Sequence, residues 1–141
     1  QSTRPQTLGY GLTDSPAGQC AWILEKFKAW TDCDGHPENV ISRDTMLDNI
    51  SLYWFTATAA SSARLYWESF KGLLTDFTPV TVPAAYSCFP EDLFTMTERW
   101  ARTRFADLRY YSQPDRGGHF PSLERPETFL TEVRNGLRAL G

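Results

Sequence analysis

The stretch Asp115-Arg116-Gly117-Gly118-His119-Phe120 places one of the chain's two histidines directly after two glycines. A β-like run precedes this stretch at residues 108–112, and a helix is expected to begin near Pro121. A histidine on a short strand-to-helix turn can reach a pocket, and imidazole readily gives and takes protons near neutral pH. General acid–base catalysis is therefore the predicted chemistry, and a turn histidine without chemistry is the alternative for so short a pattern.

Asp92 is the second candidate, because it also follows an expected strand, at residues 80–85. A helix expected at residues 97–102 separates this strand from the one at residues 108–112, which predicts parallel pairing with a right-handed crossover. Ligands bind beyond the carboxyl ends of such strands, where Asp92 could orient the imidazole of His119 and stabilise its charged form. The alternative is that Asp92 is an ordinary turn residue and that the pair never meets.

The first half of the chain is expected to be helical. Residues 1–13 are predicted to be a loop with an extended patch, followed by a helix that Asp14 caps and that runs to about Trp30. A loop at residues 32–37 contains the other histidine, His36, which is expected to be solvated.

Two further helices are expected around a run of small residues. Ser42 is a plausible N-cap for the first of them. The small residues at 57–63 either allow close backbone approach or mark a break, after which helix resumes at residues 64–70. A last amphipathic helix is expected after residues 124–127.

Composition limits the classes of partner. The 141 residues carry a net charge of −3 with no basic cluster, which disfavours nucleic acid and anionic membranes as partners. We find no apolar run that could span a bilayer and no signal peptide, and the three widely spaced cysteines form neither a disulfide framework nor a metal motif. We therefore expect no metal, no cofactor and a cytoplasmic location.

The predicted fold class is α/β, as the C-terminal part of an α/β-hydrolase fold. Two strands cannot complete such a sheet, and the chain has no G-x-S-x-G nucleophile elbow. The chain also begins at Gln1 without Met, like the middle of a longer polypeptide. We expect a helical cap portion and return to the core over residues 1–72, and the last two parallel strands with flanking helices over residues 73–141.

Several motifs occur in the order typical of one enzyme family. They are Gln1–Leu8, Leu12–Gly18, Ile23–Phe27, Leu52–Trp54, Ser61–Tyr66, Phe89–Phe94 and Arg116–Phe120. Over nearly its whole length the chain thus resembles the microsomal-type epoxide hydrolases of the α/β-hydrolase superfamily.

The resemblance implies a role for three side chains. His119 is similar to the family's general base, and Asp92 to its acidic partner, a position that is often Glu in the family. Tyr66 is similar to one of two cap tyrosines that donate hydrogen bonds to the epoxide oxygen, although from its helix alone it would be a core aromatic. Four aromatic residues are expected to serve as packing or as substrate-pocket wall: Trp54, Trp67, Phe94 and Phe120.

The implied activity is epoxide hydrolysis, an ether-bond hydrolysis used in detoxification. The family's nucleophilic aspartate and second tyrosine belong to parts of its pattern that precede Gln1, so activity would require an N-terminal portion. The expected partners are a small apolar epoxide, water and that N-terminal portion, with a homodimer as an open alternative. Other readings are a haloalkane dehalogenase, an esterase, or a non-catalytic fragment or interaction subunit; an upstream Asp or Ser nucleophile would separate the enzyme classes.

Overall fold

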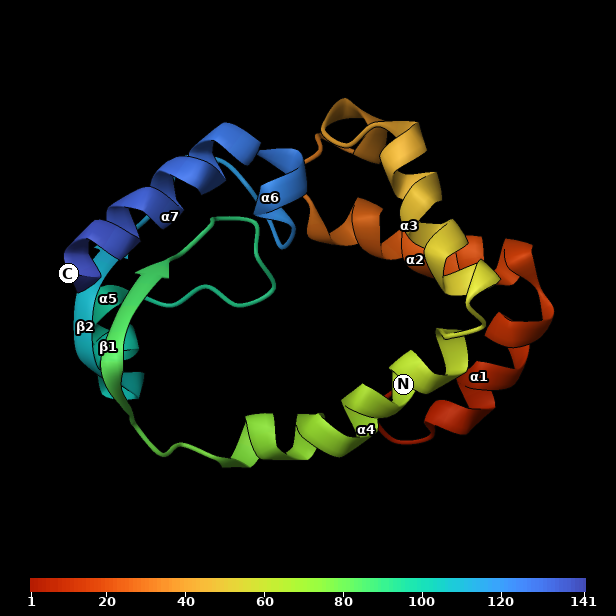
Figure 1. Cartoon of the computed structure of the whole chain (residues 1–141), viewed down its shortest axis with the longest axis horizontal. Helices are drawn as coiled ribbons and strands as arrows, with labels where there is room; N and C mark the ends of the chain where they lie inside the picture. The colour runs from red at the N-terminus through yellow and green to blue at the C-terminus, as the bar shows by residue number, and fades with distance from the viewer. The chain divides into compact units, whose positions relative to one another are not determined.

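Helices form the first half of the chain, and two strands with further helices form the second (Figure 1). The computed structural model describes the backbone of residues 1–141 and all side chains except those of Lys71, Leu73 and Leu74. Contacts divide the chain into a first unit, Gln1–Phe27 with Ser42–Phe77, and a second unit, Lys28–Ile41 with Thr78–Gly141. The assignment of residues 1–72 to a cap and of residues 73–141 to a hydrolase core stays a prediction.

The first unit is built from helices. They are α1 (Pro5–Asp14), most of α2 (Pro16–Trp30), α3 (Arg43–Phe55) and α4 (Ala59–Thr75). The predicted loop at residues 1–13 is therefore wrong, because α1 occupies most of it. Two glycines weaken the helical signal there, but Gly9 allows α1 to approach α4 closely. A Cβ added at Gly9 would lie 2.9 Å from the Cβ of Ala60.

The ends of these helices follow the capping rules, with one correction. Ser42 caps α3 as predicted, since its hydroxyl accepts a hydrogen bond from the backbone N–H of Thr45 at 3.1 Å. Before α2 it is Ser15, and not Asp14, whose side chain accepts the backbone N–H of Gly18, at 3.0 Å. Ala57 has a positive φ of 52° between α3 and α4. The small-residue run thus both breaks the helix and allows close packing.

The second unit confirms the predicted fold class, a mixed α/β arrangement with two parallel strands. Strands β1 (Val80–Ser87) and β2 (Phe105–Ser112) pair with Ser87 opposite Ser112, and each is longer than predicted. The remaining elements are η1 (Pro37–Asn39), α5 (Glu98–Arg104), α6 (Pro121–Glu124) and α7 (Pro126–Leu140).

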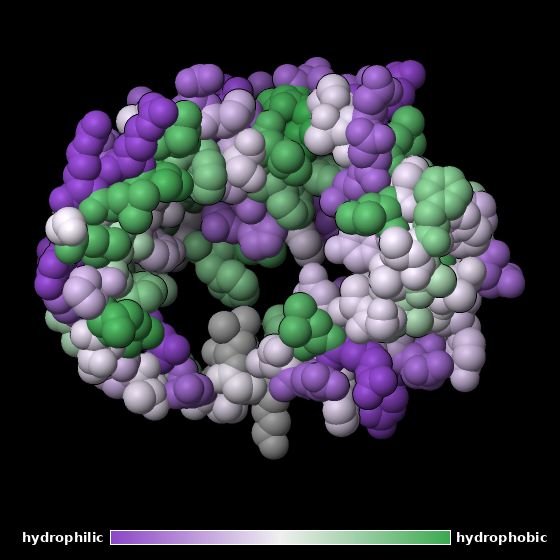
Figure 2. All heavy atoms as spheres, viewed as in Figure 1, coloured by the Kyte–Doolittle hydropathy of each residue, from purple (hydrophilic) through white to green (hydrophobic). Residues whose placement is uncertain are grey.

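Helix α7 packs on both strands through small residues. A Cβ added at Gly136 would lie 2.9 Å from the Cβ of Ala85, so the helix lies very close to β1. Figure 2 shows hydrophobic side chains on the visible surface along α7, where Leu130, Val133 and Leu137 are exposed. Within the described residues, no helix combines the length and apolar character that crossing a membrane requires.

Candidate functional site

The structure brings Asp92 and His119 together in the second unit. Asp92 Oδ1 and His119 Nδ1 are 2.7 Å apart, and the two side chains are 34% and 38% exposed. The two residues lie on the loops that leave the carboxyl ends of β1 and β2, as the parallel pairing predicted. A carboxylate can only accept hydrogen bonds, so Nδ1 carries the proton and the lone pair of the neutral imidazole is on Nε2. This arrangement can accept a proton from water at Nε2.

Two aromatic rings pack against the imidazole. The centroid of Trp30 lies 5.4 Å from that of His119, and the centroid of Phe120 lies 5.0 Å away, both in edge-on geometry. The sequence predicts Phe120 as packing or substrate-pocket wall, whereas it indicates Trp30 only as the approximate end of a helix. These rings present apolar surface beside the imidazole.

The other predicted site residues lie at several places. Phe94 follows Asp92 in the second unit and is 68% exposed. Trp54 is half-buried on α3, and Tyr66 and Trp67 are exposed on α4, all in the first unit. Their roles, like those of Asp92 and His119, stay predictions.

The glycines before His119 fit the turn for steric reasons. Gly117 has a φ of +128°, which side chains rarely adopt, and a Cβ there would lie 2.5 Å from Cδ1 of Phe89. A Cβ at Gly118 would lie 2.6 Å from the carbonyl oxygen of Trp30. The same oxygen accepts the backbone N–H of His119 at 2.8 Å. Glycine at both positions therefore lets the histidine turn pass close to its neighbours.

Asp32, which lies shortly after α2, holds the same turn by its side chain. It accepts the backbone N–H of Gly117 at 3.0 Å and pairs with the guanidinium of Arg116. These contacts and nearby Arg125 outweigh the effect of burial and lower the pKa of Asp32, with the Arg116 hydrogen bond as the largest cause. The same ion pair raises the pKa of Arg116. Sequence reasoning missed this role, because Asp32 and Arg116 are 84 residues apart.

Glu132 on α7 ties the helix to the ends of both strands. Its carboxylate accepts hydrogen bonds from Ser87 at 2.7 Å, from Tyr110 at 3.0 Å and from Ser112. Burial acts to raise the pKa of Glu132, but the three hydroxyl groups outweigh it and the pKa is lowered. The strand ends that lead to the Asp92 and His119 loops are thus anchored to one carboxylate.

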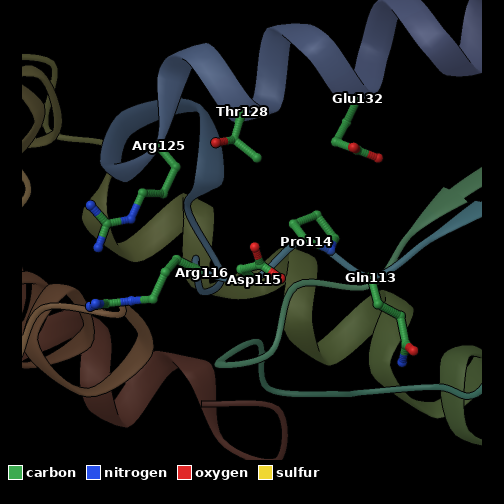
Figure 3. A pocket seen from close by; sticks show the side chains of 7 residues that line it. All are labelled: Gln113, Pro114, Asp115, Arg116, Arg125, Thr128 and Glu132. Carbon is green, nitrogen blue, oxygen red and sulfur yellow. The ribbon is translucent and has the colours of Figure 1, made fainter.

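A pocket of about 510 Å³ lies next to the histidine turn in sequence. Its lining residues are Gln113, Pro114, Asp115, Arg116, Arg125, Thr128 and Glu132 (Figure 3). The guanidinium groups of Arg116 and Arg125 extend toward the same side in Figure 3, and both contact Asp32. Neither Asp92 nor His119 lines the pocket, and the part of the chain that the structure describes has no cluster of three or more potential metal ligands.

Known proteins similar to this chain are epoxide hydrolases. No family model matches the chain. A putative epoxide hydrolase of Stigmatella aurantiaca is 53% identical over 99% of this chain and 32% of its own length. Epoxide hydrolase 1 of Sus scrofa is 39% identical over 95% of this chain and 32% of its own length. The chain thus spans about a third of the length of the curated relatives it matches.

Solved structures give the same match. The crystal structure of juvenile hormone epoxide hydrolase from the silkworm Bombyx mori superimposes with a TM-score of 0.88 and 35% identity, over 99% of this chain and 35% of the silkworm chain. The Aspergillus niger epoxide hydrolase gives a TM-score of 0.83 and 32% identity, over 99% of this chain and 34% of its own. Both likenesses extend over both units of the chain.

Proposed function

We propose that this chain carries the water-activating part of an epoxide hydrolase. The chain belongs to the epoxide hydrolases of the α/β-hydrolase superfamily, as a homologue of the C-terminal third of the microsomal and juvenile hormone enzymes. His119 is the general base, Asp92 orients it, and Tyr66 donates a hydrogen bond to the epoxide oxygen. The observation that carries this proposal is the 2.7 Å contact between Asp92 Oδ1 and His119 Nδ1 at the carboxyl ends of parallel strands.

The reaction divides into two steps. An aspartate carboxylate, which we assign to an N-terminal portion outside residues 1–141, attacks an epoxide carbon and forms an alkyl-enzyme ester. The carbon–oxygen bond of the epoxide breaks, and the oxygen that leaves takes a proton from the Tyr66 phenol. A donor aimed at such a developing oxyanion is worth about 3–4 kcal/mol in acyl transfer.

The second step uses the pair seen in the second unit. His119 Nε2 takes a proton from water, and the resulting hydroxide attacks the ester carbonyl. The tetrahedral intermediate breaks its bond to the diol oxygen, and the diol alkoxide takes the proton of the new carboxylic acid, which restores the aspartate carboxylate. The proton on His119 returns through solvent to the Tyr66 phenolate. Asp92 accepts from Nδ1 throughout and stabilises the imidazolium that forms. The aromatic rings of Trp30 and Phe120 beside the imidazole favour a small apolar epoxide as substrate.

The proposal can be tested by complementation. We would fuse residues 1–141 to the N-terminal two-thirds of the Stigmatella aurantiaca relative and measure diol formation from styrene oxide by chromatography. We expect the fusion to form the diol, and the fusion carrying Asp92→Asn to be about 10²-fold or more slower. His36→Gln, at the other histidine, is the matched control and should retain full activity.

Two results would contradict the proposal. A folded fusion that forms no diol would indicate a non-catalytic role for this part of the chain. A fusion that hydrolyses aryl esters or haloalkanes while leaving styrene oxide intact would indicate another α/β-hydrolase activity, since an acid–histidine pair serves all of these reactions.

A further inference from the structure

Glu124 at the end of α6 is a buried carboxylate, only 4% exposed. Its two oxygens accept backbone N–H groups from two separate segments. Oε1 accepts from Phe120 at 3.0 Å, and Oε2 accepts from Asp32 at 2.8 Å. A buried carboxylate is costly unless hydrogen bonds satisfy it, so this side chain joins the histidine turn to the segment after α2 across 92 residues of sequence.

The last residue of α2 and the segment that follows it in turn hold the backbone around His119. Trp30 accepts the backbone N–H of His119, at 2.8 Å, and Asp32 accepts that of Gly117, at 3.0 Å. With the bond from Phe120 to Glu124, the turn is held two residues before the histidine, at the histidine and immediately after it. Backbone bonds of this kind set the direction in which the imidazole leaves the chain.

The Asp92 loop is attached to the same turn. The backbone N–H of Glu91 donates to the carbonyl oxygen of Gly117 at 3.0 Å, and Glu91 forms a parallel bridge with Gly118. Asp92 and His119 are therefore both positioned relative to one short backbone segment, and that segment is held by Glu124 and by Asp32.

We propose that Glu124 is a positioning residue for His119, acting through the backbone of the turn and through Asp32. Its hydrogen bonds go to the backbone of Asp32 and Phe120 and not to the imidazole or to Asp92, and its importance for catalysis rests on the proposed function of His119. Its effect is to keep the Asp92 carboxylate in contact with Nδ1, which holds the imidazole proton on Nδ1 and leaves Nε2 free to accept a proton.

The carboxylate is needed because both of its oxygens accept. In Glu124→Gln the side chain keeps one accepting oxygen and replaces the other with an NH₂ group, which can only donate. That NH₂ group would face the backbone N–H of either Phe120 or Asp32, and one of the two bonds is lost. The substitution changes volume very little, so it tests the hydrogen bonds and not the packing.

The test is nuclear magnetic resonance of residues 1–141. Long-range proton–nitrogen spectra report which ring nitrogen of each histidine carries the proton, and we would record them at about pH 9, where free histidine is neutral. In the unsubstituted protein we expect the proton on Nδ1 of His119. His36 is the internal reference, because its Nδ1 accepts the backbone N–H of Glu38 and its proton is therefore on Nε2.

In Glu124→Gln we expect His119 to show a mixture with the proton on Nε2, while His36 is unchanged. Hydrogen exchange at the amides of His119 and Phe120 should become about tenfold faster than in the unsubstituted protein. Asp32→Asn is the second variant, used if Glu124→Gln does not fold. It should speed exchange at Gly117 and His119.

The control is Glu132→Gln, which removes a half-buried carboxylate that accepts hydrogen bonds from Ser87 and Tyr110 in the second unit and not from the turn. An unchanged His119 proton position and unchanged exchange in the Glu124 and Asp32 variants would overturn the proposal. The same change in Glu132→Gln at an equal loss of thermal stability would also overturn it, because the effect would then be general loosening. These measurements need no epoxide turnover. They therefore test the positioning of His119 by Glu124 even if the proposed enzyme function is wrong.

Discussion

A single contact decides which nitrogen of His119 can act as a base. Asp92 accepts from Nδ1 at 2.7 Å, so in the proposed mechanism the proton from water goes to Nε2. His119→Gln removes that base and leaves the attack on the epoxide intact, since glutamine cannot take a proton at neutral pH. We expect the fusion with His119→Gln to accumulate the alkyl-enzyme ester, with steady diol formation reduced by about 10²–10⁴-fold. Intact-protein mass spectrometry after mixing with styrene oxide detects the adduct, and unimpaired steady turnover would rule out the role.

Asp32 makes the stability of the second unit depend on pH. The pKa of Asp32 is lowered in the folded chain, chiefly by the Arg116 hydrogen bond. Its ionised carboxylate is therefore more stable in the folded state than in the unfolded state. The resulting stabilisation is fully present above the ordinary carboxyl pKa of about 4, and is lost as the pH falls through the lower folded value.

The prediction concerns the difference between the unsubstituted chain and Asp32→Asn in free energy of unfolding. Asparagine has no carboxyl proton to bind, so this difference should be largest near pH 7 and should shrink as the pH falls below about 4. Urea unfolding followed by circular dichroism at several pH values measures it. Asp44→Asn, at an exposed aspartate of α3, is the control. A difference that stays constant from neutral to acid pH would contradict the assignment.

At the scale of elements, local patterns predicted the strands, the parallel pairing and the loops that carry Asp92 and His119. Those features depend on neighbours in sequence, such as β-branched runs and turn residues. Helix α1 was missed because its stability comes from packing of Gly9 against Ala60, 51 residues later, and not from helix propensity. The contacts of Asp32 and Glu124 were missed for the same reason, since no local signal links residues about 90 apart.

Glu132 is the link between α7 and the two strands, and its loss should weaken all three elements together. In Glu132→Ala the hydroxyl groups of Ser87, Ser112 and Tyr110 lose their shared acceptor. Half-buried polar groups left unpaired cost about 1–3 kcal/mol each where water cannot replace the partner. We expect the free energy of unfolding to fall by about 2–4 kcal/mol in urea.

Arg134→Gln, an exposed change on the same helix, is the control for Glu132→Ala and should stay within about 0.5 kcal/mol of the unsubstituted chain. A small effect of Glu132→Ala, equal to that of the control, would show that the three hydroxyl groups find water instead and that α7 is held by its apolar packing alone.

At the scale of the whole chain, both units leave large apolar side chains in solvent. Phe55 is 83% exposed in the first unit, and Trp100 is 67% exposed in the second. The second unit also contains a parallel sheet of two strands, and parallel sheets are usually covered on both faces. Residues 1–141 match only about a third of the length of their relatives, so we expect an N-terminal portion of the kind those relatives have to cover part of this surface.

The fusion with the N-terminal two-thirds of the Stigmatella aurantiaca relative tests this expectation without any substrate. Covering apolar surface removes it from water, which should raise the midpoint of thermal unfolding of the fused residues 1–141 by about 5 °C or more and lower their binding of a hydrophobic dye. Differential scanning calorimetry and dye fluorescence measure the two effects, with residues 1–141 alone as the control. An unchanged midpoint with unchanged dye binding would show that these units are stable with their apolar side chains in water. The likeness to relatives about three times as long would then describe a shared ancestry and not a shared assembly.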